Sequence, residues 1–159
     1  MPIRSTAKAI IQRENKILLN KCTNKIGDYY ELPGGGQNQY ETLHEAIKRE
    51  CLEETGYAVT PIRFAALCET IHTNEAFKQQ YPEYMHMIFH IFICRLLDDA
   101  PTTPTEKDLS QTGCEWVDIN LINTPNHPPL FPTAVGDNIK SIIASETPVF
   151  LGSAYNDLF

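Results

Sequence analysis

The sequence predicts an α/β fold in which a central mixed β-sheet carries helices on both faces. Apolar and β-branched runs bounded by turn residues recur along the chain and indicate several strands. Residues 42–55 and 134–145 instead show helical patterns, and two such helices do not easily share one face of a sheet. Because 159 residues with 42% hydrophobic residues suit one core, we expect residues 1–159 to form a single domain.

The N-terminal part of the chain predicts a hairpin, a short strand and a glycine loop. Residues 5–12 and 16–22 are the expected hairpin strands, and the polar residues 13–15 form the turn between them. A short strand at 29–32 runs into segment 33–36, which is a proline followed by three glycines. Consecutive glycines permit backbone angles that other residues rarely adopt, so this loop can take an unusual shape.

The two helices are indicated by different features. Residues 42–55 contain no glycine or proline and are rich in good helix formers, and Gly56 follows at the usual C-terminal position. Residues 134–145 are amphipathic because their apolar residues recur at helical spacing. The apolar residues of this second helix are Val135, Ile139, Ile142 and Ile143.

The remaining segments are predicted to be strands and polar loops. Residues 57–72 indicate one long or interrupted strand, and residues 114–118 indicate a short one. The almost wholly apolar segment 84–97 indicates a central strand buried on both faces. The polar segments 73–83 and 98–113 are expected to be loops.

Bulk composition narrows the classes of function. A net charge of −7 with scattered basic residues argues against binding to a nucleic acid polymer. An acidic protein can still act on a phosphate compound if a divalent metal supplies the positive charge. The five cysteines are odd in number and form no CxxC pair, which favours reduced core thiols over disulfides or a zinc site. With no apolar signal region and no apolar run of the roughly 20 residues that a membrane span needs, we expect a cytoplasmic protein without a membrane partner.

Three glutamates of the first helix form a candidate metal site. On a helical wheel of about 100° per residue, Glu50, Glu53 and Glu54 continue the apolar stripe that faces the protein. Like charges crowded at a helix C-terminus repel one another, oppose the helix dipole and lose hydration. A divalent cation removes these costs, and carboxylate oxygens suit Mg²⁺. The alternative is an ordinary solvated face that pairs with Lys48 and Arg49.

The spacing around this helix resembles the Nudix box. The pattern is a glycine, a glutamate after five residues, and an Arg-Glu…Glu-Glu…Gly cluster after seven more. The matching residues are Gly35, Glu41, Arg49, Glu50, Glu53, Glu54 and Gly56. Cys51 and Tyr57 stand where the family has aliphatic residues, which changes packing more than chemistry. The box spans only Gly35–Tyr57, but Glu31–Gly34 and Glu115–Val117 also look like segments of the family, so the resemblance reaches most of the chain.

The resemblance implies a Nudix-type α/β/α sandwich with a loop–helix–loop site. In the family, carboxylates of the helix and a backbone carbonyl of the glycine loop bind Mg²⁺ or Mn²⁺. The matching positions are Glu50, Glu53, Glu54 and Gly34. The arginine matching Arg49 orients a catalytic carboxylate, and the glutamate matching Glu41 supports the site from the loop.

The implied reaction is hydrolysis of a diphosphate linkage in a nucleoside diphosphate derivative. Candidate substrates are a nucleoside triphosphate, ADP-ribose, a nucleotide sugar or a dinucleotide. Water attacks a phosphorus, and a carboxylate near the metal takes the proton. The base remains open between Glu53, Glu54 and a loop acid such as Glu106 or Asp108.

Aromatic residues near the box are candidate substrate contacts. Strand alternation places Tyr84 and His86 on one face, where either can meet a nucleobase, and Tyr29 lies just before the glycine loop. The alternative is that His86 and His90, which lie in the same strand segment, are hydrogen-bonded residues of the sheet.

Two other functions compete with the hydrolase. A catalytically inactive Nudix-fold module that senses a nucleotide has no need for all three glutamates. An isoprenoid diphosphate isomerase on the same fold needs a dedicated pair of a cysteine and a glutamate. Cys68 is a conceivable cysteine for it, but nothing in the sequence supports that role. The sequence leaves open whether the chain is a monomer or a homodimer.

Overall fold

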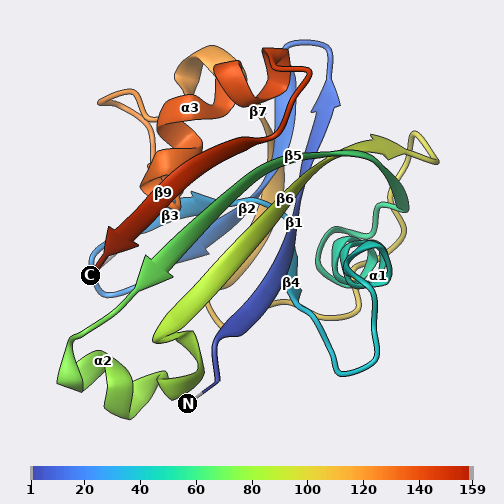
Figure 1. Ribbon diagram of the computed structural model, residues 1–159. Coiled ribbons are helices and arrows are strands. Elements are labelled where there is room, and N and C mark those ends of the chain that lie inside the picture. The colour runs from blue at the N-terminus through green and yellow to red at the C-terminus, as the bar shows by residue number, and fades with distance from the viewer. Residues whose placement is uncertain (1, 158–159) are drawn as a thin grey trace.

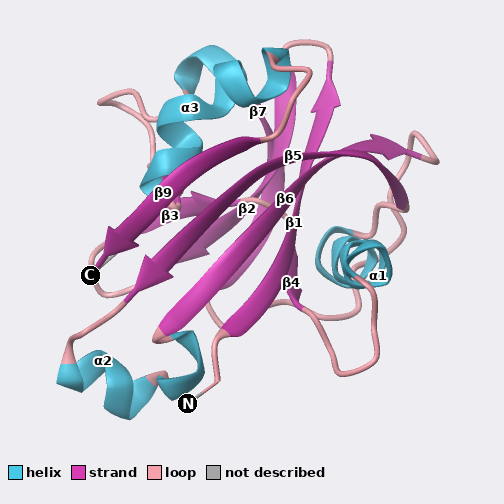
Figure 2. Cartoon of the chain, viewed as in Figure 1, coloured by secondary structure: helices cyan, strands magenta, loops and turns pink. Residues whose placement is uncertain are grey.

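The computed structural model describes residues 2–157 as a curled mixed sheet with helices on both faces (Figure 1; Figure 2). The strands are β1 (Arg4–Arg13), β2 (Lys16–Thr23), β3 (Asp28–Glu31), β4 (Gly34–Gly36), β5 (Val59–Ile71), β6 (His86–Leu96), β7 (Gln111–Asp118), β8 (Leu130–Phe131) and β9 (Val149–Tyr155). The helices are α1 (Leu43–Thr55), α2 (Glu75–Gln80) and α3 (Thr133–Ala144), with single 3₁₀ turns η1 (Pro82–Tyr84) and η2 (Ile119–Leu121).

Strand β1 joins the two halves of the sheet. The strand order is β8-β3-β2-β1-β6-β5-β9, with β4 on β1 and β7 on β2. β1 runs parallel to β6 along most of its length, but it pairs with β2 only at the hairpin end, through Gln12 and Arg13. Beyond that corner β1 pairs with β4 instead, so the glycine segment lies where the two halves separate.

The alternation of side chains along β1 builds a core on each face. Ala7, Ala9 and Ile11 belong to the cluster that packs against Ile47 of α1. Ile10 belongs to the other cluster, which holds the apolar face of α3. The two predicted helices therefore cover opposite faces, and Figure 1 shows them on either side of the strands. The predicted fold class is confirmed.

Several element boundaries differ from the prediction. Segment 57–72 is one strand, β5, whose pairing with β6 is interrupted by register shifts. The expected loop 73–83 contains α2 and most of η1, because Asn74 caps a short helix there. The expected strand 84–97 begins only at His86, since Tyr84 lies in η1. Strands β4, β8 and β9 were not predicted, and β4 lies in the segment that was expected to be a glycine loop.

Two other expectations concern cysteines and membranes. All five cysteines are free thiols, four buried and Cys114 half-buried, as expected for core residues. Between residues 2 and 157, none of the helices has the length and apolar character needed to cross a membrane.

Candidate active site

Helix α1 is held firmly at both ends. At its start, Thr42 and Glu45 form a reciprocal capping box, in which each side chain accepts a hydrogen bond from the other's backbone N–H. At its end, Gly56 has φ +76°, and its N–H donates to the Leu52 carbonyl. Thr102, in the loop between β6 and β7, packs so closely that a Cβ on Gly56 would lie 1.9 Å from its carbonyl oxygen. The residues on α1 are therefore presented on a rigid element.

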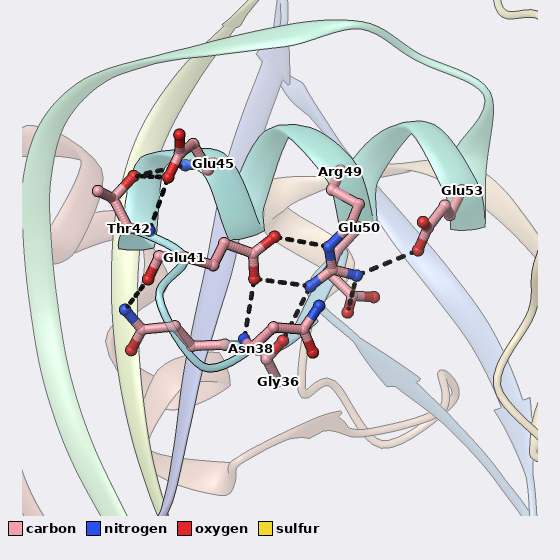
Figure 3. A network of polar contacts seen from close by, with 9 residues as sticks. Gly36, Asn38, Glu41, Thr42, Glu45, Arg49, Glu50 and Glu53 are labelled. Atoms are coloured by element: carbon pink, nitrogen blue, oxygen red, sulfur yellow. Dashed lines mark hydrogen bonds and ion pairs between the residues drawn. The ribbon is translucent and has the colours of Figure 1, made fainter.

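Arg49 gathers three carboxylates and the glycine loop around its guanidinium (Figure 3). Its Nε and Nη2 donate to both oxygens of Glu41 at 2.7 and 3.0 Å. Nη1 donates to Glu50 at 2.7 Å and to Glu53 at 3.2 Å. Nη2 also donates to the carbonyl oxygen of Gly36 at 3.0 Å. One planar fork thus fixes the loop relative to the helix, which a lysine cannot reproduce.

The network favours the charged forms of Glu41 and Arg49. The hydrogen bond from Arg49 lowers the pKa of Glu41, and the bonds to Glu41 and Glu50 raise the pKa of Arg49. Gly35 leaves room for this arrangement, because a Cβ there would lie 2.6 Å from the Glu50 carboxyl group. A side chain at this glycine of the predicted motif would therefore displace the Glu50 carboxyl group from its present position.

Glu54 occupies a different environment from its neighbours. Its side chain is buried, with 3% of the residue exposed. Its Oε2 accepts hydrogen bonds from Asn20 Nδ2 at 2.8 Å and from the Gly34 N–H at 3.0 Å. Its Oε1 has no hydrogen-bond partner among the described residues. Burial raises the pKa of Glu54 to about 7, although Lys8 and both hydrogen bonds oppose the shift.

Raising the pH from about 5 to about 8 is expected to destabilise the metal-free protein relative to Glu54→Gln. The pKa of Glu54 rises on folding from its ordinary 4.5 to about 7, so the unfolded chain releases this proton first as pH rises. Stability is therefore lost between these two values, by about 3 kcal/mol, and not above them. The measurement is the free energy of unfolding of both proteins in EDTA. A difference between them that does not change with pH would contradict the assignment.

Lys8 places a cation against the glycine loop. Its Nζ donates to the Gly34 carbonyl at 2.8 Å and lies 3.8 Å from Glu31 Oε2. Burial alone would lower the pKa of Lys8, but the charges of Glu31 and Glu54 outweigh it and raise the pKa. The buried ammonium group of Lys8 therefore contacts the Gly34 carbonyl, which the resemblance of the sequence to the Nudix box predicts to be a metal ligand.

The three predicted metal glutamates do not form a finished ligand cluster. Among residues 2–157, no group of three or more His, Cys, Asp or Glu side chains is arranged to hold a metal ion. Glu50 and Glu53 are directed at Arg49, and Glu54 is directed at Asn20 and Gly34. The donor chemistry nevertheless fits Mg²⁺ or Mn²⁺, because all candidates are oxygens and Glu54 has an oxygen to spare.

A cavity of about 650 Å³ opens beside this network and continues to α2. Its floor is made by residues that alternate along β1 and β6. These floor residues are Arg4, Thr6, Lys8, Met87, Phe89 and Ile91. Gly35, Gly36 and Glu50 line one part of the same cavity, so the predicted box opens directly into it.

The predicted substrate contacts fall on different sides of the sheet. Tyr29 and Tyr84 line the cavity. His86 does not, and its Nε2 lies 2.5 Å from Glu69 Oε1. Tyr84 and His86 do not share a face as expected, because the extended alternation starts only at His86. Of the two loop acids, Asp108 lines the cavity and Glu106 does not.

Sequence reasoning missed several cavity residues. The α2 segment contributes Phe77 and Tyr81, and the start of β1 contributes Arg4. The even-numbered positions of β1 offered a partial signal, because Thr6 and Lys8 alternate with Ala7 and Ala9. No comparable signal marked α2. Cys68, the candidate for an isomerase, is buried in the core and does not line the cavity.

Comparisons with known proteins bear on both the fold and the Nudix-box segment Gly35–Tyr57. Residues 2–134 match the family described as the NUDIX domain. The protein named "Phosphatase NudJ" from Escherichia coli strain K12 is 28% identical over 112 residues, covering 70% of this chain. The match spans 66% of that relative, and the Shigella flexneri protein of the same name matches equally. The chain thus spans slightly less than two thirds of the length of these relatives.

Solved structures resemble this fold at low sequence identity. An ADP-ribose pyrophosphatase from Streptococcus suis 89-1591 aligns with a TM-score of 0.62 and 19% identity, covering 98% of this chain and 100% of its own. A MutT protein from Methanosarcina mazei Go1 aligns with a TM-score of 0.64 and 21% identity, covering 90% and 94%. At such identities the similarity establishes the α/β/α architecture.

Proposed function

Because this chain belongs to the NUDIX family, we propose that it is a divalent-metal-dependent hydrolase that splits the diphosphate linkage of a nucleoside diphosphate derivative. The observation that carries the proposal is the network of Arg49 with Glu41, Glu50 and Glu53 at the wall of a large cavity. The relatives named as a phosphatase support hydrolysis of a phosphorus-containing bond, and the name of one structural neighbour, an ADP-ribose pyrophosphatase, agrees with a diphosphate.

The candidate ligands for Mg²⁺ or Mn²⁺ are the carboxylates of Glu50, Glu53 and Glu54 and the carbonyl of Gly34. Such an ion, when bound, neutralises phosphate charge and makes water more acidic. Glu54 suits this role because its Oε1 is buried without a partner, which is costly for a carboxylate. Lys8 donates a hydrogen bond to the Gly34 carbonyl, so the ammonium group of Lys8 places a positive charge next to the candidate metal ligands.

The remaining residues of the network orient the site. Arg49 fixes Glu41 in a two-point contact and restrains the positions of Glu50 and Glu53. Glu41 also accepts a hydrogen bond from the Asn38 N–H at 2.9 Å, which ties the loop to the network. Three acids are candidates for the base that takes a proton from water. Glu53 belongs to the Arg49 network, Asp108 lines the cavity, and Glu54 is buried beside Gly34.

The test is turnover of nucleoside triphosphates, ADP-ribose, nucleotide sugars and dinucleotides with Mg²⁺, with Mn²⁺ and with EDTA. We expect at least one compound to be hydrolysed only with metal. Glu53→Gln should lower kcat/KM by at least about 100-fold, the upper range for losing a group that merely supports a metal ligand. Glu146→Gln is the matched control, because Glu146 is exposed and does not line the cavity.

The competing function is a catalytically inactive module that senses a nucleotide. Folded protein that hydrolyses none of these compounds with either metal would favour this module over the hydrolase. Calorimetric binding of the same compounds would then measure its ligand preference.

A further inference from the structure

The part of the cavity beside α2 and η1 is lined by aromatic side chains. We call Phe77, Tyr81 and Tyr84 the aromatic wall. The ring centroids of Phe77 and Tyr81 are 5.4 Å apart, and those of Tyr81 and Tyr84 are 6.3 Å apart. All three residues are half-buried and line the cavity, so part of each ring remains accessible to a ligand. Neighbouring rings of this kind offer a surface on which a flat ring can stack.

Arg4 lies between the aromatic wall and the glycine loop. Its guanidinium carbon is 5.0 Å from the centre of the Tyr84 ring. Its Nη2 is so near the glycine loop that a Cβ on Gly36 would lie 2.6 Å away. In Figure 1, the start of β1 lies near α2, at the same end of the sheet. Arg4 therefore links the region of the proposed metal ligands to the aromatic wall.

The guanidinium of Arg4 is not neutralised by the protein. Within residues 2–157, no carboxylate forms an ion pair with it and its side chain donates no hydrogen bond. The same cavity is lined by acidic residues, among them Glu31, Glu83 and Asp108. By contrast, Lys8 is occupied by Gly34 and Glu31. Arg4 is thus a cation with its donors open to the cavity, held in place by packing on two sides.

An ordinary surface contact between an arginine and a tyrosine is the simplest alternative. Such contacts are common and need no ligand. The position of Arg4 argues for a ligand, because its guanidinium lies in a cavity beside the proposed phosphate-cleaving site and packs against Tyr84. A planar guanidinium without a carboxylate partner matches the oxygens of a phosphate group.

We propose that Arg4 binds a phosphate group of the substrate while the aromatic wall stacks on its nucleobase. This inference rests on the proposed function and assigns recognition of the nucleotide half of the substrate to Arg4 and the aromatic wall. Sugar phosphates and linear polyphosphates, which lack a flat ring, would use only part of the site. The cavity volume of about 650 Å³ falls within the range of sites that hold ligands of this size.

The experiment is calorimetric binding in EDTA, where binding is separated from hydrolysis. The ligands are ADP, GDP, CDP and UDP, with the four nucleosides and inorganic pyrophosphate for comparison. We expect at least one nucleoside diphosphate to bind more tightly than its nucleoside and than pyrophosphate. Arg4→Gln should weaken that diphosphate about 10-fold or more and leave its nucleoside unchanged, because only a charge-assisted contact to phosphate is lost.

Variants of the wall have a different expected pattern. Tyr84→Leu should weaken the nucleoside and the diphosphate by a similar factor of about 5 to 10, because stacking on the base is lost. Losing Tyr84 can also release Arg4, so Phe77→Leu provides a second test of the wall. Arg95→Gln and Tyr155→Leu are the matched controls, because both residues are exposed and lie outside the cavity lining.

Three results would overturn the inference. The first is that Arg4→Gln leaves the affinity for the diphosphate within twofold of the wild type. The second is that pyrophosphate binds as tightly as every nucleoside diphosphate while both wall variants behave like the wild type. The third is that no diphosphate binds the wild type at millimolar concentration. A chain that binds as expected but hydrolyses nothing would keep the inference and remove the proposed function, so the two failures are distinguishable.

Discussion

Replacing Glu54 with glutamine is expected to lower kcat/KM by at least about 100-fold and to remove most of the affinity for Mn²⁺. Glu54 offers a buried Oε1 without a partner, while Asn20 and Gly34 hold its Oε2. A glutamine can keep its oxygen toward Asn20 and Gly34, but it then presents an amide nitrogen where the free oxygen was. That nitrogen carries protons and does not ligate a cation. The loss of metal affinity and activity should exceed the roughly 10- to 100-fold loss that is typical when a residue supporting a metal ligand is replaced.

The measurement combines turnover with direct titration of Mn²⁺ by electron paramagnetic resonance, so that binding is seen without catalysis. Glu146→Gln, an exposed exchange of the same type, should retain both properties. Because the neutral side chain avoids the cost of a buried charge, Glu54→Gln should be at least as stable as the wild type at about pH 8 without metal. Retained Mn²⁺ affinity in a folded Glu54→Gln protein would remove Glu54 from the ligand set.

The helical wheel explains why this residue was predictable. Glu54 was placed on the inward stripe of α1 from spacing alone, and it is buried with Ala46 and Ile47. Glu50 and Glu53 were placed on the same stripe, but their side chains are only partly covered, with 17% and 26% exposed. Periodicity fixes direction from the helix axis, so it separates inward from outward residues. It does not fix side-chain torsions, so the contacts of both carboxylates with Arg49 could not be read from it.

The substrate end of the cavity was less predictable for a physical reason. α2 has only six residues and none of them is buried, so no apolar periodicity marks it. The rings at this end of the cavity belong to Phe77, Tyr81 and Tyr84. They are arranged by contacts with one another, which the sequence pattern does not encode. The 3₁₀ turn also delays the start of β6, which moves Tyr84 out of the alternation that includes His86. One boundary error therefore assigned two residues to the same face.

The edge strands show a related limit. β8 has two residues, and β9 carries Gly152 at φ +85°, so neither forms the unbroken alternation that indicates a strand. β9 is fixed instead by parallel pairing with β5, between segments far apart in sequence. The strands that build the floor of the site, β1 and β6, were predicted because long runs of apolar residues mark them.

Arg49→Lys is expected to lower kcat about 10- to 100-fold with a small change in KM. A lysine keeps the positive charge but loses the fork that contacts both oxygens of Glu41 at 2.7 and 3.0 Å. It also cannot reach Glu50, Glu53 and the Gly36 carbonyl at the same time. The affected groups position the site and do not contact most of the substrate, so the loss should fall on the chemical step.

A double-mutant cycle with Glu41→Gln identifies the cause. If Arg49 acts on kcat by holding Glu41, the double variant should be about as slow as the slower single variant. Arg95→Lys, an exposed exchange of the same type, should leave kcat unchanged. If the two losses multiply in the double variant, Arg49 and Glu41 act independently. In that case the contacts of Arg49 with Glu50 and Glu53 would account for its role.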